Sequence, residues 1–127
     1  MKTVHTPEEL YKELVKGQSR IIGKYAIRLM NEIIRDTPVD TGHAQSNWIA
    51  SFKTPFSSVI GSKARVNRGY QSASRARLGR YNILTSGPIF ISNNVAYIVR
   101  LNQGYSKQAP AGFVEAAIER ISLSDEQ

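Results

Sequence analysis

The chain has 127 residues, of which 41% are hydrophobic and 21% are charged, a composition typical of one globular domain and not of a disordered chain. It has no cysteine, which excludes disulfides, thiolate zinc sites, Fe–S clusters and cysteine nucleophiles, and which is compatible with a reducing compartment. The net charge is +7, yet no acidic residue lies between Thr41 and Val114. The cations of this middle region therefore need an outside anion, an acidic partner surface or water.

The first helix is predicted from its start signal. Residues 6–9 read Thr-Pro-Glu-Glu, in which threonine caps, proline suits the first position and the glutamates favour the positive end of the helix dipole. Apolar residues then recur at helical spacing as far as Ile34, and Pro38 disfavours helix at Thr37. We expect a helix from about residue 7 to Asp36, roughly 45 Å long. Neither an apolar leader for secretion nor a run of about 18 apolar residues is present, so no membrane partner is expected.

Five cations on this helix follow one another at intervals of four residues. They are Lys12, Lys16, Arg20, Lys24 and Arg28. Four residues advance about 400°, so the cations form a ridge that winds slowly around the helix. The ridge is interpreted either as a solvated face or as a docking surface for something acidic.

A turn and a strand are predicted next. Residues 37–42, Thr-Pro-Val-Asp-Thr-Gly, are typical of a turn, and residues 46–52 alternate as in a half-buried strand. The better-filled face of that strand carries Trp48, Ala50 and Phe52. We therefore expect Trp48 in the core, against the first helix.

The segment 61–79 has little apolar content and no acid, and it is predicted as a flexible basic loop. Residues 61–69 read as loop, and a helix is only weakly indicated over Tyr70–Leu84. The cations in or beside the segment are Lys63, Arg65, Arg68, Arg75, Arg77 and Arg80. We expect them to act through charge, at an assembly interface or facing DNA, with a merely solubilising loop as the alternative.

The C-terminal third is predicted to hold short elements. These are a strand at 89–91, a short helix around 97–101 ended by Gly104, a turn at 105–110 and an amphipathic helix from Ala111 that carries Ile118 on its apolar face. The tail 122–127 should fray. The expected architecture is one α+β domain over residues 1–127, with a long N-terminal helix packed on a small, mostly antiparallel sheet and short C-terminal helices.

The sequence gives little support for a catalytic function. Asp40-Thr41-Gly42 matches the triplet of aspartic proteases, but it follows a helix and a Thr-Pro pair instead of an apolar strand, so a capping turn is favoured. The two histidines, His5 and His43, fit neither a metal-ligand spacing nor a catalytic triad. We predict that the protein is not an enzyme and carries no cofactor or metal.

Two segments carry a resemblance to a known family. The first is Thr-Pro-Val-Asp-Thr-Gly at 37–42, directly after a long helix; the second is Asn-Asn-Val-Ala-Tyr at 93–97 with Leu-Asn-Gln-Gly-Tyr-Ser-Lys-Gln-Ala-Pro-Ala-Gly-Phe-Val at 101–114. In this order they resemble the tailed-bacteriophage neck or tail-completion family of small head–tail joining components. The sequence departs from the family at Asn102, where an acid is usual, which puts any conserved salt bridge there in doubt. Residues 61–79 do not match the family.

The resemblance implies a structural role. Members are α+β subunits of rings at the head–tail junction and have no known chemistry. The implied partners are other copies in the ring and neighbouring portal, adaptor or tail-tube proteins. The implied location is the virion, after synthesis in the host bacterial cytoplasm. Tyr105, Lys107 and Gln108 would be subunit contacts on the 105–110 turn. A small basic DNA-binding module without sequence specificity is the alternative function, and a homodimeric aspartic protease is a remote one.

Overall fold

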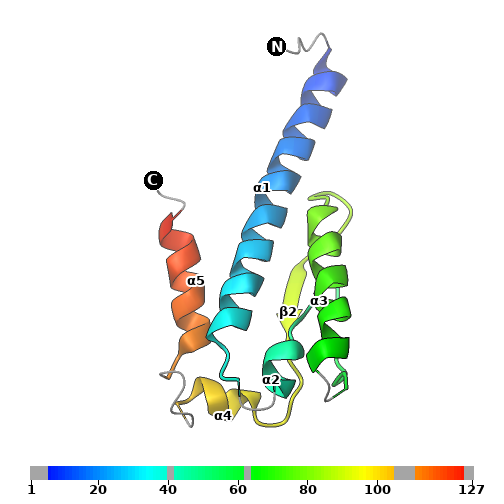
Figure 1. The fold of residues 1–127 in the computed structure, drawn as a ribbon. Helices are drawn as coiled ribbons and strands as arrows, with labels where there is room; N and C mark the ends of the chain where they lie inside the picture. Colours follow the sequence, from blue (N-terminus) through cyan, green and yellow to red (C-terminus); the bar gives the residue numbers. More distant parts are fainter. Residues whose placement is uncertain (1–5, 40–41, 62–63, 105–110, 125–127) are drawn as a thin grey trace.

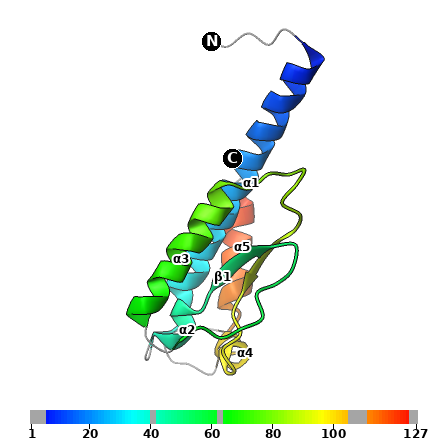
Figure 2. The ribbon, with the colours of Figure 1, turned by 90° about the vertical axis from the view of Figure 1, so that its right-hand side faces the viewer.

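The computed structural model of the chain describes residues 6–39, 42–61, 64–104 and 111–124, and it is an α+β arrangement (Figure 1). The elements in chain order are α1 (Pro7–Asp36), α2 (His43–Ser46), β1 (Ile49–Phe52), α3 (Ala64–Gly79), β2 (Ile89–Ser92), α4 (Ile98–Asn102) and α5 (Phe113–Ser124). Helices α3 and α5 lie on opposite sides of α1 (Figures 1 and 2).

Helix α1 has the bounds that the sequence predicts. Thr6 is the N-cap, with an extended backbone and a hydroxyl that accepts a hydrogen bond of 3.1 Å from the Glu9 N–H. The helix ends at Asp36, where the Thr37 N–H closes the last turn on the carbonyl groups of Ile33 and Ile34. With 30 residues it is the longest helix of the fold, and α2, α3 and α5 pack against it.

The sheet has two antiparallel strands, β1 and β2, with Ala50 opposite Ile91. The strand predicted from residue 46 begins only at Ile49, because residues 43–46 form α2. Gly42 is the N-cap of that helix, and its φ of 82° suits glycine. Just after the helix, the Asn47 side-chain amide donates to the His43 carbonyl. The expected alternation is also wrong in part: Ile49, assigned to the poorer face, is buried, whereas Phe52 is half-buried.

The core lies between α1, α3, α5 and the sheet. Its buried apolar residues are Ala26, Met30, Ile33, Trp48, Ala50, Leu78 and Ala117. Trp48 is therefore in the core with residues of α1, which confirms the prediction. Its Nε1–H donates to Thr37 Oγ1 at 2.8 Å, and that hydroxyl donates to the Ile33 carbonyl at 2.6 Å. The indole thus keeps its polar group satisfied while it is buried.

Helix α3 overturns the prediction of a flexible loop at 61–79. It begins six residues before Tyr70 and ends at Gly79, well short of Leu84. Its inner face is polar, with Asn67, Gln71 and Ser74 buried beside Leu78. Each of these side chains makes a hydrogen bond to a neighbouring element: the Asn67 amide donates to Ser46 Oγ at 3.0 Å, the Gln71 amide donates to the Gln45 carbonyl at 2.9 Å, and Ser74 Oγ accepts from the Ala50 N–H at 3.1 Å. The Oδ1 of Asn67 is buried without a hydrogen-bond partner. A search for apolar periodicity misses such a helix.

The C-terminal elements follow the predictions with local differences. Strand β2 and helix α4 lie close to where they are expected, and Gly104 follows α4 with a φ of 95°. Helix α5 packs on α1 through Phe113, Ala117 and Ile121, but Ile118, predicted on the same face, is 46% exposed. Residues 122–124 are helical where the sequence predicted a frayed end; residues 125–127 lie outside the described residues.

An ion-pair cluster joins α5 to α1. The Arg120 guanidinium contacts the carboxylates of Asp36 and Glu32. The hydrogen bond with Asp36, followed by the attraction of both carboxylates, raises the pKa of Arg120 above its usual value. The cation of α5 is thus directed toward α1.

Candidate assembly surface

The structure separates the cations of the predicted basic segment. Lys63 lies outside the described residues, and Arg65 lies in α3 without a described side chain. Arg68 is exposed on the first half of α3 and Arg80 is exposed just beyond its end. Their positions differ by twelve residues, which corresponds to roughly 18 Å along a helix, so these two guanidinium groups do not form one cluster.

Arg75 and Arg77 are used by the fold itself. Arg75 Nε donates to Asn31 Oδ1 of α1 at 2.8 Å, and Arg77 Nη1 donates to the Ala50 carbonyl at 2.6 Å. Ser74 takes the N–H of the same Ala50, so α3 satisfies the edge of β1 that faces away from β2. An uncovered strand edge can pair with other chains, and Ser74 and Arg77 occupy the backbone groups of Ala50 at this edge.

The predicted contact residues Tyr105, Lys107 and Gln108 lie outside the described residues, but the structure shows how their segment is anchored. Asn102 joins its two ends. The Asn102 carbonyl accepts from the Gly112 N–H at 2.6 Å, its Oδ1 accepts from the Val114 N–H at 3.0 Å, and its Nδ2 donates to the Glu115 carboxylate at 2.9 and 3.0 Å.

Sequence reasoning noted Asn102 only as a departure from the family pattern. The informative signal is chemical, because an amide donates and accepts at once and a carboxylate only accepts. Here the amide caps the start of α5 through its oxygen and binds Glu115 through its nitrogen.

The N-terminal half of α1 extends beyond the rest of the molecule, as Figures 1 and 2 show. Large apolar side chains remain exposed on it: Leu10 is 51%, Tyr11 56% and Leu14 56% exposed. A water-exposed helix half gains little from packing, and short helices without packing are marginal in water. Several such side chains on one segment make this surface a candidate docking site.

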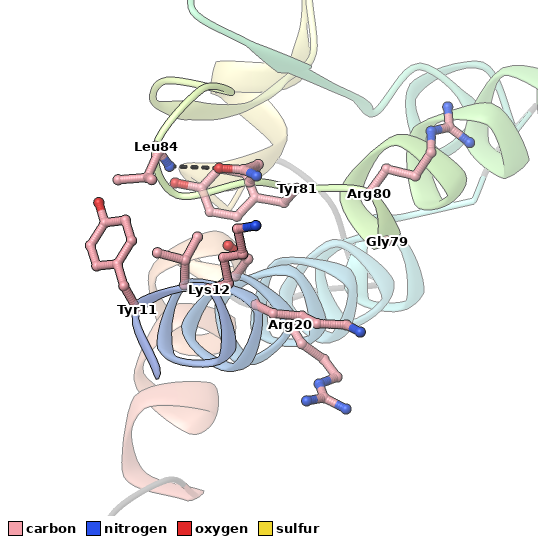
Figure 3. Close-up of a pocket in the computed structure, with 11 residues that line it drawn as sticks. Tyr11, Lys12, Arg20, Gly79, Arg80, Tyr81 and Leu84 are labelled. Carbon is pink, nitrogen blue, oxygen red and sulfur yellow. Dashed lines mark hydrogen bonds between the residues drawn. The ribbon is translucent and has the colours of Figure 1, made fainter. Parts of the chain in front are cut away.

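A groove of about 540 Å³ lies where α1 extends beyond the end of α3. The face of α1 that is buried at Ser19 and Gly23 continues to Val15, Lys12 and Tyr11, but α3 has already ended at Gly79. The loop after α3 forms the other wall. In Figure 3, Tyr11 and Leu84 lie at one end of the groove, and Lys12 projects between α1 and the loop, toward Tyr81.

The loop wall is held by hydrogen bonds. The Ile83 N–H donates to Ser19 Oγ of α1 at 2.9 Å, which fastens the loop to the helix. Within the loop, Asn82 accepts from the Leu84 N–H and donates its own N–H to Ser86 Oγ, both at 2.9 Å. The groove is thus a built feature of the fold.

The groove combines apolar surface with positive charge. Its cations are Lys12, Lys16, Arg20 and Arg80, and no acidic residue lines it. The first three are members of the ridge that the sequence predicts. Beside them lie Val15, Tyr81 and Leu84, the last 59% exposed. The arrangement suits an occupant that offers both carboxylates or phosphates and an apolar contact.

Three further possibilities are a protease-like site, a metal site and a membrane-spanning helix. Of the protease-like triplet at 40–42, Asp40 and Thr41 lie outside the described residues. Among the described residues, no group of histidine, aspartate or glutamate is placed to hold a metal ion. None of the described helices has the length and apolar character needed to cross a membrane.

Comparisons with protein-family models, with curated proteins and with solved structures found no significant match to this chain.

Proposed function

We propose that this protein is a virion structural subunit of the head–tail junction of a tailed bacteriophage, a neck or tail-completion protein that assembles into a ring. The family resemblance of residues 37–42, 93–97 and 101–114 suggests the role. The observation that carries the proposal is the uncovered N-terminal half of α1, with Leu10, Tyr11 and Leu14 more than half exposed. A neighbouring subunit would bury these side chains, each contributing part of the roughly 1.5–3 kcal/mol that full burial of a large apolar residue gives.

In this proposal the protein is made in the host bacterial cytoplasm and then incorporated into the virion. It contacts its own copies in the ring, and portal, adaptor or tail-tube proteins above and below. The proposal includes no catalytic step and no cofactor. The segment 105–110, with Tyr105, Lys107 and Gln108, would contribute contacts from the end of the molecule where Asn102 anchors it.

The test is assembly of the full chain. Electron microscopy and light scattering after size exclusion should show rings of uniform size. Leu10→Ser combined with Leu14→Ser should shift the population toward monomer with little loss of monomer stability, because both side chains are already exposed. Val59→Ser with Val99→Ser is the control, since these residues are also exposed but do not belong to α1. A wild-type chain that stays monomeric at high concentration would contradict the proposal.

The DNA-binding alternative rests on the acid-free groove and its cations. It requires that duplex DNA bind to the chain and that log Kd depend steeply on log salt, because phosphate contacts release counterions. Changing Lys12, Lys16 and Arg20 to Glu should then abolish DNA binding. If DNA binding is absent at low salt while rings form, this alternative is excluded.

A further inference from the structure

We propose that the groove between α1 and the loop after α3 receives the outward face of α5 from the next copy of this chain. The inference rests on the proposed function, in that it assumes a ring of identical subunits. It adds which surfaces meet and in what direction.

The groove supplies one half of the contact. Lys12, Lys16, Arg20 and Arg80 form no ion pair among the described residues, and the groove is lined by no carboxylate. From Tyr11 to Arg20 it follows α1 for roughly 14 Å, which is enough for two to three turns of another helix. In Figure 3, the side chains of Arg20 and Arg80 lie at one end of the groove and point away from each other. The side chain of Lys12 lies between α1 and Tyr81.

Helix α5 supplies the other half. Because Phe113, Ala117 and Ile121 are buried against the body, the opposite face carries Glu115, Ile118, Glu119 and Ser122 at helical spacing, all exposed. Glu115 binds the neutral amide of Asn102 and forms no ion pair among the described residues. The one cation of α5, Arg120, is directed to Asp36 and Glu32.

The two surfaces are complementary and lie on different sides of the molecule. The outward face of α5 offers carboxylates around one apolar side chain, Ile118; the groove offers cations around Tyr81 and Leu84. Since α3 and α5 flank α1 on opposite sides, one copy cannot bring them together within itself (Figures 1 and 2). A contact between two different patches repeats from subunit to subunit, and it closes into a ring when the rotation allows.

Two charge-reversed variants of the full chain test this contact. The groove variant carries Lys12→Glu, Lys16→Glu and Arg20→Glu. The helix variant carries Glu119→Lys and Ser122→Lys, and it leaves the hydrogen bonds between Glu115 and Asn102 in place. Each variant alone should associate at least about tenfold more weakly than the wild type in sedimentation velocity, because like charges then face each other. An equimolar mixture should assemble again, since each altered surface finds its opposite on the other variant.

A matched control reverses three exposed cations outside the groove, Lys24→Glu, Lys53→Glu and Arg68→Glu, and it should assemble like the wild type. Circular dichroism establishes that each variant is folded, and the two variants report independently on the two surfaces. Association that persists in either variant, or a mixture that does not recover, overturns the proposal. Rings formed by the wild type and by both variants would leave the proposed function standing and remove only this contact. A groove variant that assembles but loses duplex DNA would assign the groove to nucleic acid.

Discussion

The carbonyl oxygen of Leu78 lies so close to Gly23 that a β-carbon on this glycine would be 2.5 Å from it. Helix α3 ends against α1 at this point, and only a residue without a side chain permits the approach. From the sequence, Gly23 is a weak point of the long helix. In the structure α1 and α3 approach each other closely at this residue, so the lower helix propensity accompanies a packing requirement.

Gly23→Ala should therefore destabilise the protein, although alanine is the better helix former. We expect a loss of about 1–3 kcal/mol in the free energy of unfolding, typical of an overpacked core. The control is Gly17→Ala, where a β-carbon meets nothing within 4 Å and the gain should be up to about 1 kcal/mol. Urea denaturation measures both. Equal effects of the two substitutions would show that the helices are not in contact at Gly23.

The pair of Trp48 and Thr37 gives a second prediction. Thr37→Val leaves the buried indole N–H without an acceptor and should cost about 1–3 kcal/mol of stability. Thr37→Ser keeps the hydroxyl and should retain most of the stability. Trp48 is the one tryptophan of the chain, so its fluorescence follows unfolding directly. If the valine and serine variants unfold at the same urea concentration, the hydrogen bond does not stabilise the fold.

The edge of β1 gives a third prediction. Ser74→Ala removes the acceptor of the buried Ala50 N–H and should cost about 1–3 kcal/mol. Arg77→Ser removes the donor to the Ala50 carbonyl and should also destabilise, whereas Arg68→Ser, at an exposed site on the same helix, should leave the melting temperature nearly unchanged. Equal melting temperatures for the Arg77 and Arg68 variants would contradict a structural role for Arg77.

Asn102 gives a fourth prediction. Asn102→Asp places a second carboxylate beside Glu115 and removes the amide donor, so it should destabilise by about 1 kcal/mol or more at neutral pH. Adding Glu115→Gln restores a donor and should recover part of the loss, which a double-mutant cycle measures. A cycle with no coupling energy would mean that the two side chains act independently.

Several elements were predictable because their signals are local. The cap at Thr6, the proline after it and the block at Pro38 act on neighbouring backbone groups, so the bounds of α1 follow from the sequence. The same holds for Gly104, whose positive φ ends a short helix. Trp48 could be assigned to the core because a large aromatic on the filled face of a strand has few alternatives to burial.

Helix α3 and the groove were decided by the tertiary structure. Asn67, Gln71 and Ser74 are buried because Ser46, Gln45 and Ala50, 21 to 26 residues away in sequence, supply their partners. The pattern of the segment alone is that of a solvated chain, since polar burial stabilises only when such partners are in place. Likewise, Lys12 and Lys16 are regularly spaced cations in the sequence, and they become part of a groove because α3 ends at Gly79 while α1 continues. Local sequence thus determined where the long helix begins and ends, and packing determined which of its faces was left open.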